Sequence, residues 1–133
     1  MTEVTPKDQK TVLIVDDQEP TRMLIKAAIQ NTGIDCQVFE ATDGDSALAA
    51  AQQRRPDLVL LDIVLPDSSA SGVLLCTYLC KDAHIKVVII SGQASKTIVQ
   101  TCLNAGAIDY IPKPFSVEVL QERITEWLTD SRN

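Results

Sequence analysis

Short runs of consecutive apolar residues recur along this chain, and they restrict its fold more than any other feature of the sequence. The clearest runs lie at residues 11–15, 58–61 and 86–90. Runs of this length and character are typical of strands that are buried on both faces, because a strand with one wet face alternates apolar and polar residues. Residues 36–39 and 109–111 are candidates for two shorter strands of the same sheet.

Helical patterns fill the intervals between these strands. We expect helices at residues 18–31, 46–53, 72–80, 94–105 and about 116–129. Pro20 suits a first helical turn, Gly33 and Gly106 suit helix ends, and Ser116 suits an N-cap. Five strands alternating with five helices predict an α/β fold, a flavodoxin-like doubly wound three-layer sandwich. Its five-stranded parallel sheet is expected to have the strand order 2-1-3-4-5.

The spacing of apolar residues within two of these helices predicts which side chains recur on one face. In the first helix these are Met23, Leu24, Ala27 and Ala28, and Arg22 is expected to be solvated rather than bound. In the last helix the expected inward stripe is Val117, Leu120, Ile124, Trp127 and Leu128.

The size and charge of the chain limit the classes of protein to which it can belong. Its 133 residues fit one domain, and 45% of them are apolar, which is enough for a buried core. A formal net charge of −6 argues against direct nucleic-acid binding, which needs a basic face. No apolar run approaches the roughly 20 residues of a membrane span, and residues 1–10 lack the apolar stretch of a signal peptide. We expect a cytoplasmic protein without membrane contact, in which residues 1–10 form a flexible tail.

The four cysteines, at positions 36, 76, 80 and 102, are expected to be reduced thiols in that compartment. Cys76, Cys80 and His84 are four residues apart, so one continuous helix would place them on one face and suggest a metal site. Free cysteines are more often small buried hydrophobes, and we expect His84 to lie beyond the helix end. Core packing is therefore favoured over metal or redox chemistry.

Polar residues stand where the predicted strands end. Asp16 and Asp17 follow the first strand, Asp62 follows the third, Ser91 follows the apolar residues of the fourth, and Lys113 follows the fifth. Each could have a plain structural role, such as capping the next helix or being solvated. The carboxyl ends of parallel strands meet at one edge of the sheet, however, and the first and third strands are neighbours in the expected order. We therefore expect all five residues to form one site.

The residue types in this set predict phosphoryl transfer to a carboxylate. Three neighbouring carboxylates need compensating charge, and Mg²⁺ supplies it through one or two carboxylates and phosphate oxygens; Mn²⁺ can substitute. Lys113 adds a fixed positive charge, and Ser91 adds a hydroxyl that can bond to a phosphate oxygen. Such a reaction needs mainly positioning and charge neutralisation, with Asp62 as the nucleophile.

Several short motifs follow one another in a recognisable order. They are Val15-Asp16-Asp17, Leu61-Asp62 with Pro66 four residues on, Ser91-Gly92, and Tyr110 before Lys113-Pro114-Phe115. Together they resemble the receiver domain of two-component response regulators over nearly the whole chain. The resemblance implies a receiver domain at residues 11–130. We expect no output domain, because only a few residues follow the last expected helix.

The resemblance also implies a role for each matched residue. Asp62 would be the phosphoacceptor, assisted by Lys113 and Ser91. The metal ligands would be Asp16, Asp17, Asp62 and the backbone carbonyl of Val64.

Two further expectations concern the response to phosphorylation. Ser91 would move toward the phosphoryl group and Tyr110 would turn inward, which would reshape the face made by the fourth helix, fifth strand and fifth helix. The peptide bond between Lys113 and Pro114 would be cis.

The resemblance implies a signalling domain that assists its own phosphorylation and dephosphorylation rather than an independent enzyme. The phosphoryl donor would be a phosphohistidine on a sensor histidine kinase or a histidine phosphotransfer protein. The output would be binding to an unknown downstream protein, or relay of the phosphoryl group, by a monomer or a phosphorylation-dependent dimer.

The sequence departs from the family pattern near the site. Residues 67–71 form a longer segment than is usual, and Ser71 stands where an aspartate usually precedes the glycine. Val64 and Gln93 occupy positions that, in such domains, influence how water reaches the acyl phosphate. We hypothesise that the apolar Val64 shields the phosphoryl group and prolongs the phosphorylated state.

Three other functions are compatible with parts of the pattern. A phosphorylation-independent interaction module of the same fold would not need this cluster of charge. An aspartate-based phosphatase would need a substrate pocket and usually a cap domain. A flavodoxin-like FMN carrier would have a Ser/Thr/Gly-rich loop after the first strand, where this chain has two carboxylates that repel anions.

Overall fold

The sheet has the expected number, direction and order of strands. The structure, a computed structural model, describes residues 9–65, 72–92 and 94–129. Five parallel strands pair in the order β2-β1-β3-β4-β5, which confirms the predicted topology. Their bounds are β1 Lys10–Val15, β2 Cys36–Ala41, β3 Leu58–Leu61, β4 Lys86–Ser91 and β5 Asp109–Pro112. β1 thus begins at Lys10, a residue that the sequence analysis placed in the tail, and the amide of Lys10 donates to the carbonyl of Asp35 over 2.9 Å.

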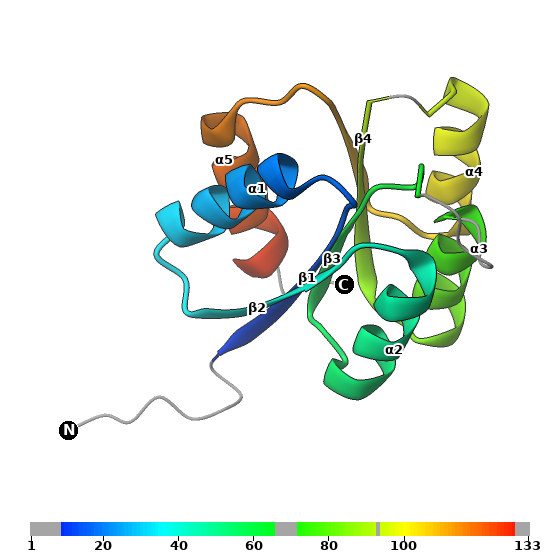
Figure 1. Cartoon of the computed structure of the whole chain (residues 1–133), viewed down its shortest axis with the longest axis horizontal. Helices are drawn as coiled ribbons and strands as arrows, with labels where there is room; N and C mark the ends of the chain where they lie inside the picture. Colours follow the sequence, from blue (N-terminus) through cyan, green and yellow to red (C-terminus); the bar gives the residue numbers. More distant parts are fainter. Residues whose placement is uncertain (1–8, 66–71, 93, 130–133) are drawn as a thin grey trace.

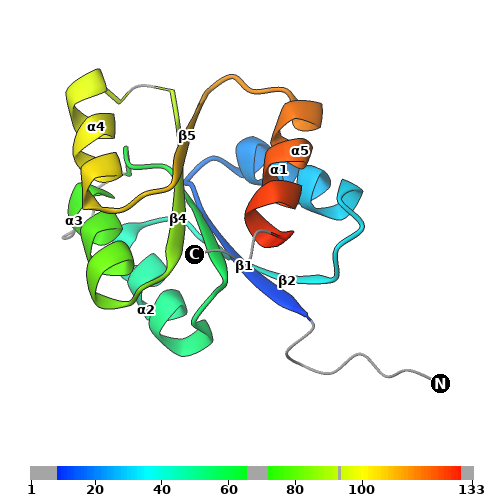
Figure 2. The same cartoon turned by 180° about the vertical axis from the view of Figure 1, so that it is seen from behind.

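Helices cover both faces of the sheet, as Figures 1 and 2 show from opposite sides. One face carries α1 and α5, and the other carries α2, α3 and α4. Their bounds are α1 Glu19–Asn31, α2 Gly44–Arg54, α3 Gly72–Thr77 with its π-helical continuation η2 Tyr78–Asp82, α4 Lys96–Ala105 and α5 Val117–Thr129. None of the helices in the described ranges is long and apolar enough to cross a membrane.

The two faces of the sheet are packed as two separate apolar layers. Successive residues of a strand point to opposite faces, so Leu13 and Val15 join the layer under α2, α3 and α4, while Val12 and Ile14 join the layer under α1 and α5. All four side chains are at most 1% exposed. This double burial is the physical reason for the continuous apolar runs in the sequence.

Only part of the apolar pattern of α1 packs against the sheet. Met23 and Leu24 are exposed, at 58% and 47%, whereas Ile25, Ala28 and Ile29 are buried. Ala28 belongs to the predicted pattern and is buried, and Ile25 and Ile29 pack beside it in the layer next to the sheet. In α5 the predicted stripe is buried at Leu120, Ile124, Trp127 and Leu128, and Val117 packs against it.

Helix boundaries differ from the predictions where a cap or a change of helix type sets them. α2 begins at Gly44 because Asp43 and Ser46 form a reciprocal capping box. α4 begins at Lys96, since the Ser95 hydroxyl accepts from the amide of Ile98 over 3.1 Å. The third helix is α-helical only to Thr77 and then widens into a π-helical segment, so it does not run at one pitch to residue 80.

Gly72, the first residue of α3, lies against the backbone that leaves β3. A Cβ atom at this position would lie 2.2 Å from the carbonyl oxygen of Ile63 and 2.5 Å from its Cα. Ile63 comes directly after Asp62, so the absence of a side chain at Gly72 is what allows α3 to begin beside the carboxyl end of β3. The longer segment at residues 67–71 and the position of Gln93 lie outside the described residues.

Candidate functional site

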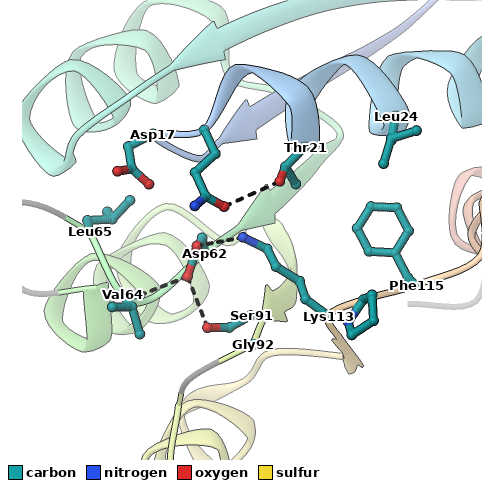
Figure 3. Close-up of a pocket in the computed structure, with 12 residues that line it drawn as sticks. Asp17, Thr21, Leu24, Asp62, Val64, Leu65, Ser91, Gly92, Lys113 and Phe115 are labelled. Carbon is teal, nitrogen blue, oxygen red and sulfur yellow. Dashed lines mark hydrogen bonds and ion pairs between the residues drawn. The ribbon is translucent and has the colours of Figure 1, made fainter.

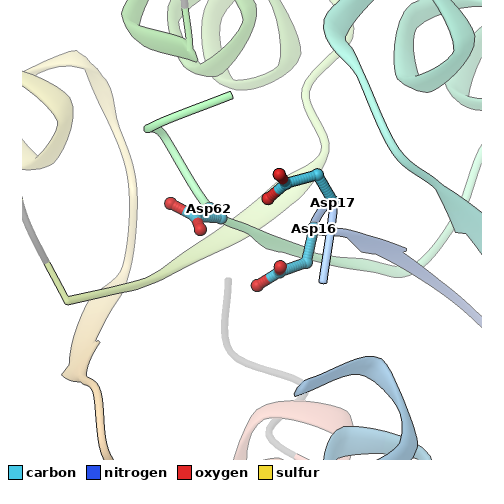
Figure 4. A group of neighbouring side chains, drawn as sticks. All are labelled: Asp16, Asp17 and Asp62. Carbon is cyan, nitrogen blue, oxygen red and sulfur yellow. The ribbon is translucent and has the colours of Figure 1, made fainter. Parts of the chain in front are cut away.

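The carboxyl ends of the strands bring the predicted residues to one edge of the sheet. Asp16 and Asp17 follow β1, Asp62 follows β3, Ser91 ends β4 and Lys113 follows β5. The three aspartates each offer an oxygen within 4.8 Å of the others, and Figure 4 shows their carboxyl groups turned to the same side. Asp16 and Asp62 are buried, whereas Asp17 is exposed.

Asp62 is held by three donors that come from three parts of the chain. Its Oδ1 accepts from the amide of Val64 over 2.9 Å and from the Ser91 hydroxyl over 3.0 Å. Its Oδ2 accepts from the Lys113 ammonium over 3.0 Å. Figure 3 shows these bonds around Asp62 at the floor of a cavity. The Asp62 side chain is 8% exposed, and both of its oxygens accept hydrogen bonds. It therefore has the fixed geometry that a nucleophilic carboxylate needs.

Asp16 is buried with one oxygen incompletely satisfied. Its Oδ1 accepts from the amide of Gln18 over 2.9 Å. Its Oδ2 lies 2.8 Å from the Lys113 ammonium, which makes an ion pair, yet no donor in the described residues hydrogen-bonds to this oxygen. A buried carboxylate oxygen without a hydrogen bond is rare in folded proteins. It is suited to a cation that approaches from the side of Asp17 and Asp62.

Lys113 bridges the two buried carboxylates. Burial by itself lowers the pKa of this ammonium, but the adjacent carboxylates of Asp16 and Asp62 outweigh burial and raise the pKa of Lys113 above its ordinary value. The side chain is therefore a permanent positive charge at neutral pH. It is 17% exposed, so the charge is accessible to a ligand in the cavity.

The donor set fits a hard divalent cation. Three carboxylates share one ammonium among them, which leaves excess negative charge at the edge of the sheet. Oxygen ligands, a mixture of buried and exposed carboxylates, and room for water match the preferences of Mg²⁺. Within the described residues, the three aspartates are the one group placed to hold a metal ion. Cys76, Cys80 and His84 do not form such a group, and His84 lies beyond the end of η2 with a φ of 57°.

Arg22 is a residue of the site that sequence reasoning missed. Instead of being solvated, it donates to the backbone carbonyl of Asp16 over 2.8 Å and to Glu40 over 2.7 Å. Lys26 also pairs with Glu40 over 2.9 Å, and the hydrogen bonds from Lys26 and Arg22 lower the pKa of the Glu40 carboxyl. The guanidinium therefore ties α1, β2 and the end of β1 together behind the metal-ligand candidates. No local sequence pattern indicates these contacts, because Arg22 lies on α1 and Glu40 lies on β2.

Tyr110 lies on β5, and its hydroxyl donates to the backbone carbonyl of Ser91 over 3.2 Å. The ring is half-buried and packs against the apolar layer under α2, α3 and α4. The amide of Lys113 donates to the same carbonyl over 3.1 Å, and the peptide bond between Lys113 and Pro114 is cis, as predicted. The backbone carbonyl of Ser91, at the end of β4, therefore accepts hydrogen bonds from both Tyr110 and Lys113.

An open cavity of about 620 Å³ lies above the carboxylates. One side of it is polar, with Asp17, Asp62, Ser91 and Lys113, and the other is apolar, with side chains that include Leu24 and Phe115 (Figure 3). The exposure of Leu24, unexpected from helical periodicity, is explained by this position on the cavity wall. A charged group can reach Asp62 while an apolar surface contacts the rest of an incoming molecule.

The family of the chain is established by comparison with known proteins. The sequence matches the response regulator receiver domain over residues 12–125. It is 37% identical over 118 residues to the phosphate regulon transcriptional regulatory protein PhoB of Pseudomonas aeruginosa, covering 86% of this chain and 50% of that protein. It is 36% identical over 124 residues to a histidine kinase P4 of Formosa agariphila, covering 91% of this chain and 9% of that protein. The chain therefore spans half or less of the length of these curated relatives.

Solved structures agree with this assignment. The receiver domain of NtrX from Brucella abortus superposes with a TM-score of 0.78 at 35% identity, over 90% of this chain and 99% of that domain. A CheY-like receiver domain protein from Methanospirillum hungatei superposes with the same TM-score at 32% identity, over 90% of this chain and 94% of that one.

Proposed function

Because this chain belongs to the response regulator receiver domain family, the signalling domains of two-component systems, we propose that it accepts a phosphoryl group on Asp62 in a Mg²⁺-dependent reaction. The single observation that carries this proposal is the setting of Asp62. It is a buried carboxylate with both oxygens oriented, within 4.8 Å of two other aspartates and in contact with a lysine. A merely structural domain gains nothing from such a cluster, because the repulsion between its carboxylates destabilises the fold.

Each neighbour of Asp62 has a task in the proposed transfer. An oxygen of Asp62 attacks phosphorus, an oxygen–phosphorus bond forms, and the bond from phosphorus to the donor nitrogen breaks. Lys113 moves from Asp62 Oδ2 toward the phosphoryl oxygens, where its positive charge stabilises the transition state. Ser91 gives up its hydrogen bond to Asp62 Oδ1 and donates to a phosphoryl oxygen instead.

Asp16, Asp17 and Asp62, with the backbone carbonyl of Val64, would hold the cation. Mg²⁺, or Mn²⁺ in its place, supplies charge neutralisation between carboxylates and phosphoryl oxygens that otherwise repel each other. The buried Oδ2 of Asp16, which has no hydrogen bond within the described residues, supports this assignment.

Ser91 would transmit the effect of phosphorylation from the site to β5. When the Ser91 hydroxyl moves, the carbonyl of the same residue shifts, and that carbonyl is bonded to Tyr110 on β5. Tyr110 would thereby transmit the change to the face formed by α4, β5 and α5, where an unknown downstream protein, or a second copy of the domain, would bind.

The proposed donor is a phosphohistidine on a sensor histidine kinase or a histidine phosphotransfer protein. The apolar wall of the cavity supports a protein donor, because a protein surface can pack against Leu24 and Phe115 whereas a small phosphate ester lacks the apolar area to do so. Onward relay of the phosphoryl group would use the same wall.

The proposal is tested by the intact mass of the chain after incubation with acetyl phosphate and Mg²⁺. We expect a gain of one phosphoryl group that is lost in Asp62→Asn and in a sample treated with EDTA. A gain that persists in Asp62→Asn would overturn the assignment of the acceptor. No gain in the wild-type chain would favour the phosphorylation-independent interaction module.

Replacing Arg22 with methionine should weaken Mg²⁺ binding about tenfold, the lower range for loss of a group that orients a metal ligand. The guanidinium fixes the backbone carbonyl of Asp16, and methionine keeps the apolar stem but not that bond. Isothermal titration calorimetry measures the affinity. Lys26→Met is the matched control, since it removes the other partner of Glu40 without touching Asp16; an equal loss there would assign the effect to Glu40.

Replacing Val64 with asparagine should shorten the half-life of the phosphorylated chain several-fold. Val64 lines the cavity beside Asp62, and its side chain is 45% exposed, so it covers the approach to the acyl phosphate without a polar group that could orient water. The loss of the phosphoryl group after removal of acetyl phosphate is followed by intact mass. An unchanged half-life would contradict the shielding role of Val64.

A further inference from the structure

Gly92 follows the last residue of β4 directly and lines the cavity above Asp62. The proposed phosphoryl transfer gives this residue no task. Its φ lies outside the left-handed region that Gly33 and Gly106 occupy, so its backbone conformation does not require a glycine. The lack of a side chain at this position therefore concerns the space beside the backbone.

That space is next to the aliphatic stem of Lys113. A Cβ atom at Gly92 would lie 3.2 Å from the Cβ of Lys113, 3.7 Å from its carbonyl oxygen and 3.8 Å from its Cδ. The first of these distances is shorter than ordinary van der Waals contact, so the lysine would have to shift. The stem of Lys113 thus runs along the side of Gly92 on which a side chain would stand.

Both ends of Lys113 are held by other groups. Its amide donates to the carbonyl of Ser91 over 3.1 Å, which ties its backbone to the strand that precedes Gly92. Its ammonium lies 2.8 Å from Asp16 Oδ2 and 3.0 Å from Asp62 Oδ2, and Figure 3 shows the side chain extended toward Asp62. Because the backbone end is tied to β4, a side chain at position 92 would displace the stem and, with it, the ammonium.

We propose that Gly92 is a positioning residue of the site, because the absence of a side chain there lets the Lys113 ammonium lie between Asp16 and Asp62. This inference rests on the proposed function, in which Lys113 neutralises phosphoryl oxygens and the aspartates hold Mg²⁺. Gly92 acts through Lys113 and not by contact with the reacting atoms. The size of the side chain at position 92 therefore sets the place of the positive charge.

A displaced ammonium has two effects of opposite sign. In its present place it offsets the negative charge of Asp16 and Asp62 and repels a second cation, so its displacement should strengthen the binding of Mg²⁺. The same displacement removes positive charge from the place where the phosphoryl oxygens arrive, so phosphoryl uptake should slow. A narrower cavity would slow uptake without strengthening Mg²⁺ binding, and a distorted site would weaken both.

The test compares Gly92→Val and Gly92→Ala with the wild-type chain. For Gly92→Val we expect a dissociation constant for Mg²⁺ about threefold lower, measured by isothermal titration calorimetry. Its initial rate of uptake from acetyl phosphate, at saturating Mg²⁺, should be about tenfold lower, which is less than the roughly hundredfold loss when a stabilising donor is removed entirely. Gly92→Ala should change both quantities in the same directions but less, and it carries the same measurements if Gly92→Val does not fold.

Lys113→Met supplies the matched background for the Mg²⁺ titrations. Methionine keeps an aliphatic stem next to position 92 but has no charge to displace. Adding Gly92→Val to Lys113→Met should therefore leave the affinity for Mg²⁺ unchanged, whereas it raises the affinity of the chain that retains Lys113. An equal gain in both backgrounds would overturn the proposal, because the effect would not depend on the ammonium.

Two other outcomes would also overturn it. Slower uptake with unchanged Mg²⁺ affinity would show that Gly92 sets only the width of the cavity, and weaker Mg²⁺ binding in Gly92→Val and Gly92→Ala would show a distorted site. The Mg²⁺ titrations involve no phosphoryl transfer, so they decide the role of Gly92 even if the wild-type chain takes up no phosphoryl group. That last result would instead overturn the proposed transfer to Asp62.

Discussion

Replacing Lys113 with methionine should lower the free energy of unfolding by about 3 kcal/mol at neutral pH, the lower end of the cost of breaking a buried ion pair. The ammonium lies 2.8 Å from Asp16 and 3.0 Å from Asp62, and both carboxylates are buried. Without it, two buried negative charges next to a third have no cation. Urea denaturation without divalent cations, compared with the wild-type chain, measures the loss.

The matched control is Lys26→Met. Lys26 pairs with Glu40 over 2.9 Å, but the lysine side chain is 40% exposed, so its loss should cost at most about 0.5 kcal/mol. Similar losses in the two variants would show that burial of the carboxylates does not matter. Mg²⁺ should stabilise Lys113→Met more than the wild-type chain, since a bound cation would replace the missing charge.

The contribution of Lys113 should also depend on pH in one direction. The folded state raises the pKa of this lysine above its ordinary value of 10.5, so the stabilisation is fully present below pH 10.5. It is lost as the pH rises through the higher pKa of the folded state. The difference in stability between the wild-type chain and Lys113→Met should therefore stay constant from neutral pH to about 10 and diminish only above 10.5.

Replacing Gly72 with alanine should destabilise the domain by about 3 kcal/mol, at the upper end for overpacking of a rigid site. The new methyl group would lie 2.2 Å from the carbonyl oxygen of Ile63. A backbone atom cannot relieve this clash by a change of rotamer, as a side chain can. Because Ile63 follows Asp62, the shift should also lower the rate of phosphoryl uptake. Denaturation and the acetyl phosphate assay measure the two effects.

Gly33→Asn is the control for Gly72→Ala. Gly33 also has a special backbone conformation, with a φ of 76°, but nothing lies within 4 Å of a Cβ placed there. Asparagine tolerates this conformation, so the loss should be below about 1 kcal/mol. A large loss at Gly33 with a small one at Gly72 would contradict the argument from close approach.

The parts of the fold that were predictable from sequence are those set by local repetition. A strand buried on both faces must be apolar at consecutive residues, so β1, β3 and β4 were visible in the sequence. Because parallel strands end at one edge of a sheet, the sequence alone predicts that Asp16, Asp17, Asp62, Ser91 and Lys113 lie together.

What could not be predicted depends on contacts between distant segments. The partners of Arg22 are a carbonyl and a carboxylate contributed by β1 and β2, and no periodicity encodes them. Helical spacing in α1 does not say which apolar residues face the sheet, and only the packing against the sheet buries Ile25 and leaves Leu24 exposed. The π-helical turn after Thr77 has no counterpart in local propensity.

The carboxylates of the site come from distant parts of the chain, which affects the kinetics of folding. Its carboxylates come from β1 and β3, and its lysine follows β5, so the group assembles only when strands from most of the chain have paired. Repulsion of Asp62 by Asp16 and Asp17 is then absent from the early stages of folding and acts on the native state alone. Interactions of this kind change the rate of unfolding far more than the rate of folding. The domain therefore carries, at the edge of the sheet that holds Asp62, a charge repulsion that hastens opening, and we expect a cation bound there to lengthen the lifetime of the folded state.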